Sequence, residues 1–343
     1  MTRREALLEL FRDNPKPLAV PMVVADHAAK LSRRKLGKVV TSGELLAKSL
    51  LKAYTVYDYD AILVFADTTV EAEALGCTIK IPDNDNPSLV TSLGMDNVKP
   101  VTELNLKSRI PVVLDATRAI VKEVGNDVPV FTSLKGPFSL ASFLVGTEDF
   151  LTRLRSEPIS CRKVLRFALR HQQQYVDAIV AAGGIPFIGE PLASGDVISR
   201  RDFETFVLPF VRELIDYAGS IVRPIGLHVC GDTSDRVVLL RDTGADILSV
   251  DNVELAFARR KAGKDTVLMG NVPTDLILQG PAEKVLEAAR TCLKDAGPRF
   301  ILSSACDIPR DTPAENVKAI IEAARESATD GQGLKPKTAR RKS

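Results

Sequence analysis

The sequence predicts a (β/α)₈ barrel of the TIM type, preceded by a short N-terminal helical extension. Short apolar segments rich in β-branched residues alternate with amphipathic helical segments along most of the 343 residues. Such alternation is typical of parallel strands joined by crossover helices. Eight strand segments can be marked, and eight strands close a barrel. No glycine-rich GxGxxG turn appears, which disfavours an open doubly wound sheet.

The N-terminal extension is indicated by Thr2-Arg3-Arg4-Glu5, which has the pattern of a capping box, and by apolar residues that follow at helical spacing. The predicted strands cover residues 18–24, 61–65, 128–133, 185–188, 225–229, 246–250, 266–269 and 300–303. The predicted helices cover residues 41–57, 139–144, 160–182, 201–218, 234–242, 253–262, 282–295 and 312–328.

Domain organisation follows from the same pass along the chain. Segment 68–127 fits the alternation least well, because it is long and holds the loop 82–87, and it predicts an excursion from the barrel. No repeat or Pro/Ser-rich linker divides the chain, so we expect residues 1–328 to form a single TIM-barrel domain. The polar stretch that begins at Thr329 leads into basic residues, and segment 329–343 is predicted to be a disordered basic tail.

Composition excludes several classes of protein. With 45% hydrophobic and 26% charged residues, the chain has the balance of a globular protein with an ample core. A net charge of +2 gives no electrostatic reason to expect nucleic acid or an acidic membrane surface as a partner. No apolar run is long enough to span a membrane, and the N-terminus does not resemble a signal peptide. We therefore expect a cytoplasmic protein, whose five cysteines are free thiols or metal ligands.

Three residues at predicted strand ends indicate a metal site. His228 and Cys230 lie two apart at the end of one strand, so their side chains point to the same face. Cys306 follows the last predicted strand, and all strand ends of a barrel converge on one mouth. One histidine and two cysteines match catalytic zinc with an open fourth position. The alternative is a buried structural histidine with two cysteines acting as small apolar residues, the role we assign to Cys77, Cys161 and Cys292.

The charge of such a site favours one kind of chemistry. Two thiolates and a neutral imidazole cancel the +2 charge of zinc, so a substrate thiol bound as a third thiolate makes the complex net anionic. Electron density then stays on the substrate sulfur while the metal keeps it deprotonated. The donor set therefore favours alkylation of sulfur over hydrolysis.

Two motifs surround the predicted metal ligands: Leu227-His228-Val229-Cys230-Gly231-Asp232-Thr233 and Ser304-Ala305-Cys306-Asp307-Ile308-Pro309. They resemble the zinc-binding signatures of cobalamin-dependent methyltransferases of the uroporphyrinogen decarboxylase superfamily, typified by methylcobamide:coenzyme M methyltransferase. Segments 67–77, 136–138, 270–272 and 312–316 add to the likeness, which covers about residues 1–327.

The resemblance implies a TIM barrel that takes a methyl group from methylcobalamin or a related corrinoid, held by a separate corrinoid-carrying protein, and passes it to a zinc-bound thiol. It assigns His228, Cys230 and Cys306 as Zn²⁺ ligands. It places Asp251 where some members have a displaceable fourth acidic ligand, although Asp is one methylene shorter than their Glu. Asp251 could equally cap the helix that begins near Val253.

The acceptor and the direction of transfer stay open at this point. Coenzyme M, homocysteine, another thiol or a folate are candidate acceptors, and a demethylase running in reverse or a non-enzymatic corrinoid or zinc carrier are alternatives. The superfamily's namesake decarboxylase has an arginine-containing segment near the first strand, where this chain reads Pro21-Met22-Val23-Val24-Ala25-Asp26-His27. Without those arginines, uroporphyrinogen decarboxylation is disfavoured. The sequence indicates no oligomeric state.

Four further residues follow predicted strands and should line the same rim: His27, Asp67, Glu190 and Asn271. We predict that they bind substrate or support the metal ligands, with helix capping as the alternative for each. Lys135, beside the Gly136-Pro137 turn, either meets an anionic substrate group or is exposed.

Overall fold

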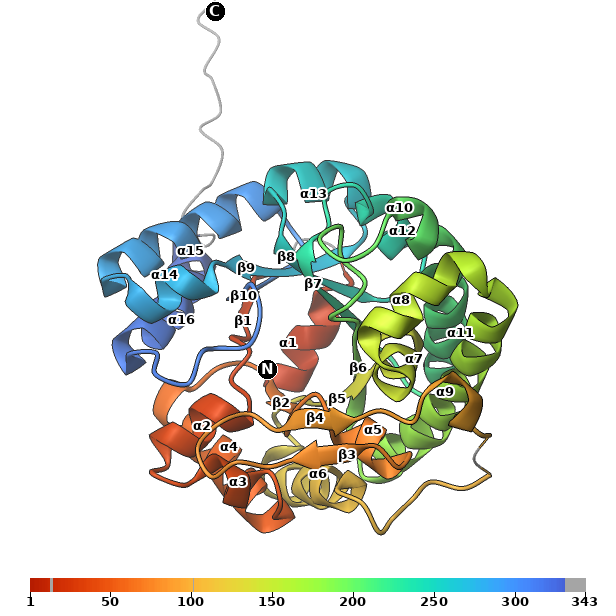
Figure 1. The fold of residues 1–343 in the computed structure, drawn as a ribbon. Coiled ribbons are helices and arrows are strands. Elements are labelled where there is room, and N and C mark those ends of the chain that lie inside the picture. The colour runs from red at the N-terminus through yellow and green to blue at the C-terminus, as the bar shows by residue number, and fades with distance from the viewer. Residues whose placement is uncertain (13–14, 101, 331–343) are drawn as a thin grey trace, which may run out of the picture.

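The computed structural model describes residues 1–12, 15–100 and 102–330, without the side chains of residues 329 and 330. Eight parallel strands form one curled sheet in the order β1-β10-β9-β8-β7-β6-β5-β2, with helices around the outside (Figure 1). This confirms the predicted (β/α)₈ barrel and every one of its eight strands. The strands are β1 Leu18–Ala19, β2 Ile62–Val64, β5 Val130–Lys135, β6 Ile185–Gly189, β7 Gly226–Asp232, β8 Ile247–Asn252, β9 Val267–Val272 and β10 Phe300–Ser304.

The helices lie around the sheet, and most of them cover its outer face. They are α1 Arg3–Glu9, α2 Ala25–Leu31, α3 Leu36–Val39, α4 Gly43–Tyr57, α5 Val70–Ala74, α6 Ile110–Val124, α7 Pro137–Val145, α8 Thr147–Ser156, α9 Pro158–Ala181, α10 Arg200–Asp202, α11 Leu208–Gly219, α12 Val237–Arg241, α13 Leu255–Ala262, α14 Thr274–Gln279, α15 Ala282–Ala296 and α16 Ala314–Asp330. Within the described residues, no helix is long and apolar enough to cross a membrane.

The predicted excursion at 68–127 is a small antiparallel sheet of β3 Thr78–Lys80 and β4 Ser88–Thr91, followed by the short helix η1 Met95–Asn97. The same segment also contains α5 and the regular barrel helix α6, which sequence reasoning missed. The expected disorder of 329–343 falls mostly outside the described residues, and the single-domain organisation stays a prediction.

Three predicted elements differ from the structure. The first strand ends at Ala19 instead of residue 24, because Pro21 has no N–H to donate to a neighbouring strand. The predicted helix 201–218 is interrupted by a π-helical turn, η2 Phe203–Val207, which ends two residues before Pro209. The predicted helix 234–242 shortens to α12.

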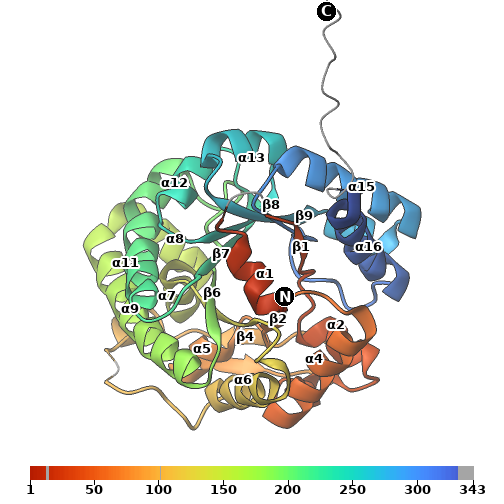
Figure 2. The same ribbon diagram turned by 180° about the vertical axis from the view of Figure 1, so that it is seen from behind.

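Helix α1 closes the N-terminal end of the barrel, where it lies across the opening (Figure 2). Its predicted capping box is present, with the Thr2 side chain accepting from the Glu5 amide at 3.1 Å. Leu7 and Leu10 belong to one apolar cluster with residues of the strands and of the segments next to them: Leu18, Val20, Met22, Val24, Ala61, Leu63, Phe131, Ile185, Phe187, Ile247, Val267, Met269 and Ile301. One end is therefore sealed by apolar packing, and the opposite end carries the polar side chains.

Where β1 meets β2, the structure records no strand pairing among the described residues. Asp60, just before β2, bridges this gap instead. Its amide donates to the Ala19 carbonyl at 2.8 Å, and its Oδ2 accepts from the Ala19 amide at 2.7 Å.

Candidate metal centre

The three predicted metal ligands meet at the C-terminal mouth of the barrel. His228 and Cys230 lie on β7, and Cys306 follows β10 by two residues. One ligand atom from each lies within 4.8 Å of the others. His228 Nε2 is 3.2 Å from Cys230 Sγ, and the two sulfurs are 3.7 Å apart. The structure thus brings together residues 76 positions apart in the chain.

The His228 ring is oriented by a neighbour on the next strand. His228 pairs with Ser249 of β8 in register, and its Nδ1 is 3.0 Å from Ser249 Oγ. This contact leaves Nε2 facing the sulfurs, as expected of a metal-binding histidine whose second nitrogen is held by a hydrogen bond. Sequence reasoning missed Ser249, because only the strand register reveals it.

Electrostatics at this cluster favour the protonated form of the Cys306 thiol. The neighbouring Cys230 and burial together raise the pKa of the Cys306 thiol. Burial alone would lower the pKa of His228, but Cys306, Asp307 and Asp251 outweigh it and raise that pKa. A cation bound here would therefore displace protons.

Cys230, Cys306 and His228 line a mouth cavity of about 70 Å³. The mouth cavity is the space bounded by Met22, Leu63, Phe65, Thr68, Ser133, Leu134, Lys135, Phe187, Gly189, Pro191, His228, Cys230, Cys306 and Asp307. Burial raises the pKa of Asp307 to about 6. Sequence reasoning missed Asp307, although its place directly after Cys306 could have indicated it.

Asp251 lies near this cluster but is not one of its three members. Its Oδ2 accepts from the Gly231 amide at 2.7 Å, which links β8 to the turn after Cys230. Gly231 has φ +73, and a Cβ there would lie 2.4 Å from Asp196 Oδ2. The alternative role of Asp251 as a helix cap is wrong, because α13 begins after Glu254. Its role as a fourth ligand stays a prediction.

Two of the other predicted rim residues hold the framework together. His27 is buried, its Nε2 lies 2.8 Å from the Tyr57 hydroxyl, and its Nδ1 lies 3.2 Å from the carbonyls of Pro309 and Arg310. Burial lowers the pKa of His27. Asp67 forms a buried ion pair with Arg109. Neither residue lines the mouth cavity, and their roles in substrate binding stay predictions.

Glu190 is fully buried at the end of β6 and closes the first turn of α7. Its carboxylate accepts from the amides of Phe138 at 3.0 Å and Ser139 at 2.8 Å, and from the Ser139 hydroxyl at 2.6 Å. A Cβ on Gly136 would lie 2.0 Å from Glu190 Oε1, so only glycine permits this approach. Burial raises the pKa of Glu190 to about 7. Its predicted contact with substrate is likewise untested.

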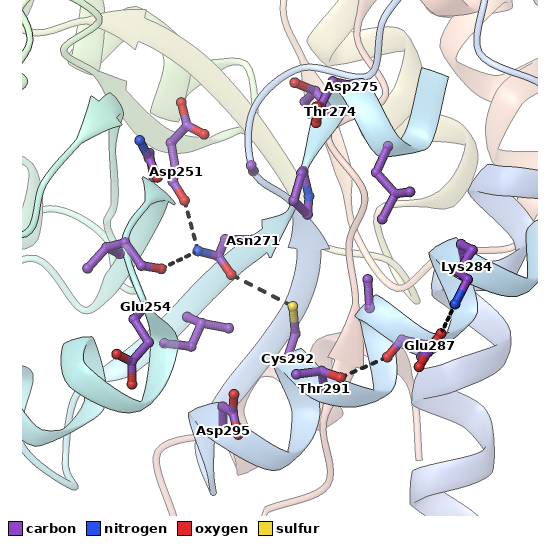
Figure 3. A pocket seen from close by; sticks show the side chains of 17 residues that line it. Asp251, Glu254, Asn271, Thr274, Asp275, Lys284, Glu287, Thr291, Cys292 and Asp295 are labelled. Carbon is purple, nitrogen blue, oxygen red and sulfur yellow. Dashed lines mark hydrogen bonds and ion pairs between the residues drawn. The ribbon is translucent and has the colours of Figure 1, made fainter. Parts of the chain in front are cut away.

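A wider cleft of about 830 Å³ opens beside the centre, between the ends of β8 and β9 and one face of α15 (Figure 3). Asn271 lies within it, donating from Nδ2 to the carbonyls of Asp251 and Val253, both at 2.8 Å. Glu287 and Asp295 on α15 form another part of its wall. None of the three donor residues lines this cleft. We therefore place the chemistry in the smaller mouth cavity despite the difference in volume.

Comparison with known proteins links this geometry to a family. The model of the family described as uroporphyrinogen decarboxylase (URO-D) matches residues 4–327. The chain is 30% identical to a methylated-thiol–coenzyme M methyltransferase of Methanosarcina mazei, over 83% of this chain and 77% of that protein. It is 29% identical to the methylcobamide:CoM methyltransferase MtbA of Methanosarcina acetivorans, over 94% of this chain and 98% of that protein.

A solved structure described as a methyltransferase from Methanosarcina mazei superposes with a TM-score of 0.87. The superposition has 27% sequence identity and covers 95% of this chain and 99% of that one. The close superposition confirms the barrel as the shared scaffold.

Proposed function

The chain belongs to the uroporphyrinogen decarboxylase family, and on that premise we propose that it is a zinc-dependent methyltransferase that moves a methyl group from a methylated corrinoid to a thiol such as coenzyme M. The observation that carries the proposal is the cluster of His228, Cys230 and Cys306 in the mouth cavity. Both relatives described above are named as coenzyme M methyltransferases, which supports the same reaction.

The donor set fits zinc on distance as well as on chemistry. Zinc–sulfur bonds of about 2.3 Å at a tetrahedral angle imply sulfurs about 3.8 Å apart. The two sulfurs here are 3.7 Å apart, so little movement is needed to hold the ion. When bound, zinc supplies Lewis acidity that lowers the pKa of a coordinated thiol and keeps its sulfur nucleophilic. Asp251 is our candidate fourth ligand, and it would have to leave the Gly231 amide to act.

The residues of the chain orient the acceptor and exclude water. In the proposed reaction the sulfur lone pair forms a carbon–sulfur bond to the methyl group, the carbon–cobalt bond of the donor breaks with its electron pair left on the corrinoid cobalt, and the thiol proton is released. Apolar walls that include Met22, Leu63 and Phe187 keep water from the sulfur, so the thiolate is not stabilised by solvent.

A cavity of about 70 Å³ suits a small acceptor and not a corrinoid. This supports delivery of the methyl group by a separate corrinoid-carrying protein at the mouth.

The same cavity argues against uroporphyrinogen decarboxylation. A tetrapyrrole with many carboxylates needs both space and several cations. Lys135 is the one lysine in the lining, which contains no arginine.

We also propose a reducing, cytoplasmic location, supported by the five cysteines, all of which are free thiols.

The first prediction tests the centre with Cys230→Ala. Zinc content should fall from near one equivalent to near zero, because two donors hold the ion far more weakly than three. Methyl transfer from methylcobalamin to coenzyme M should fall by at least about 100-fold. Zinc is measured by atomic absorption and transfer by the corrinoid spectrum.

Cys161→Ala is the matched control, since Cys161 is a buried cysteine on α9 outside the cavity. Wild-type protein without zinc, or undiminished transfer in Cys230→Ala, would refute the proposal. Zinc binding without methylation of any thiol would shift the assignment to a folate acceptor, a demethylase or a carrier.

A further inference from the structure

Lys135 is a buried cation in the wall of the mouth cavity. The residue is only 4% exposed, and it lines the cavity with His228, Cys230 and Cys306. Its Nζ lies 4.9 Å from the centroid of the Phe143 ring. This cation–π contact favours the ammonium but satisfies none of its three N–H donors. Across the described part of the chain, Nζ has no ion pair or hydrogen bond.

The nearby carboxylates are already engaged with other donors. Burial lowers the pKa of Lys135, and the charges of Glu71, Asp67 and Glu190, together with Cys230, oppose that effect. Glu71 accepts from the Lys135 backbone amide at 2.7 Å. Asp67 pairs with Arg109, and Glu190 accepts two amides at the start of α7. These carboxylates oppose the effect of burial on the pKa of Lys135 without binding its ammonium group.

The backbone of Lys135 is held from both sides. Besides the bond from its amide to Glu71, its carbonyl accepts from Gln172 Nε2 on α9, and it pairs with Gly189 in strand register. The base of the side chain is therefore fixed at the end of β5. A buried ammonium without partners is costly, so this arrangement is suited to a ligand that brings the missing negative charge.

We propose that Lys135 is the specificity-determining residue of the acceptor site, where its free N–H donors bind the negatively charged end of the thiol acceptor. The inference rests on the proposed function and adds the specificity-determining residue. The sulfur would lie at the His228 and Cys230 side of the cavity, and the anion would take the free N–H donors of Lys135. A neutral thiol of the same length would leave those donors unpaired.

The second prediction compares three acceptors in the zinc-loaded protein with methylcobalamin as donor: 2-sulfanylethanesulfonate, 3-sulfanylpropanoate and the neutral 2-sulfanylethanol. The wild type should prefer the two anionic thiols. Lys135→Met, which keeps most of the side-chain volume, should raise KM for them by at least about 10-fold while changing KM for 2-sulfanylethanol less than about 2-fold.

Lys163→Met is the matched control, because Lys163 also lies over a phenylalanine ring, Phe167, but is exposed on α9. It should behave as the wild type. Equal losses for charged and neutral thiols in Lys135→Met, or no preference in the wild type, would overturn the inference. Should Lys135→Met not fold, Lys135→Gln keeps a donor without the charge and takes its place.

Calorimetric binding of 2-sulfanylethanesulfonate to the zinc-loaded protein separates this inference from the proposed function, because it needs no methyl donor. Binding that weakens about 10-fold in Lys135→Met supports the anion site even if no thiol is methylated. Binding that is unchanged in Lys135→Met overturns the anion site even if methyl transfer is efficient.

Discussion

The hydroxyl of Ser249, on the strand beside that of His228, orients the imidazole ring of this candidate metal ligand. His228 and Ser249 face each other because β7 and β8 pair in register, and the 3.0 Å contact at Nδ1 leaves Nε2 directed at Cys230. In a metal site, this hydrogen bond fixes both the ring orientation and the tautomer. Ser249 does not line the mouth cavity and acts through the histidine.

The third prediction concerns this positioning role. Ser249→Ala should weaken zinc binding about 10- to 100-fold, because the imidazole loses the partner that orients it. Affinity is measured by competition with a chromophoric chelator. Ser142→Ala is the control, since Ser142 is also fully buried but its hydroxyl has no partner among the described residues. Wild-type affinity in Ser249→Ala would show that the hydrogen bond does not support the ligand.

At the scale of elements, the start of helix α7 depends on the carboxylate of Glu190, the residue that follows strand β6. Pro137 occupies the first position of the helix and has no amide proton, while the amides of Phe138 and Ser139 point at Glu190. A negative charge at a helix N-terminus is favourable. Burial nevertheless raises the pKa of this carboxyl to about 7, so the element is sensitive to pH in the neutral range.

The fourth prediction follows from the sign of that shift. Because the folded-state pKa is raised, the native protein binds more protons than the unfolded chain between about pH 4.5 and pH 7. The group's contribution to the free energy of unfolding is largest below this window. It falls by up to about 3 kcal/mol as the pH rises through it. Glu190→Gln should remove that part of the pH dependence, as measured by urea unfolding between pH 4.5 and 8.

Glu322→Gln on the exposed face of α16 is the control and should leave the pH profile unchanged. If Glu190→Gln and the wild type lost stability in parallel over the window, Glu190 would not be the group responsible.

At the scale of the whole molecule, the two ends of the barrel have different tasks. The N-terminal end is closed by α1, and its apolar cluster continues up the barrel interior to Met22, Leu63 and Phe187, which also line the mouth cavity. One continuous apolar column therefore supports the floor of the candidate centre. Stability and chemistry are separated along the barrel axis, as is general for this fold.

The fifth prediction tests that separation. Leu10→Ala should lower the free energy of unfolding by about 2–5 kcal/mol, because Leu10 is fully buried beneath the barrel. Leu8→Ala, a neighbour that is 52% exposed, should change it by less than about 0.5 kcal/mol. Both are measured by urea unfolding, and zinc content should match the wild type in both. A loss of zinc in folded Leu10→Ala would show that the two ends are coupled.

The sequence by itself determined the barrel, the capping box of α1 and the three residues of the candidate metal centre. Strand periodicity and capping are local properties, readable within a few residues. The C-terminal ends of the strands must meet in any closed parallel barrel, which is why His228, Cys230 and Cys306 could be placed together. The break at Pro21 and the helix α6 were missed, because one proline outweighed an apolar pattern and a long loop obscured a regular helix.

Only the tertiary structure decided what the remaining polar residues do. The side chains of His27 and Asp67 bind framework partners instead of lining the cavity, and Asp251 binds the Gly231 amide. Lys135, left open between solvent and substrate, is buried beside the donor cluster. A pattern can place a residue at the rim, but the direction of its side chain depends on register and packing between segments far apart in the chain.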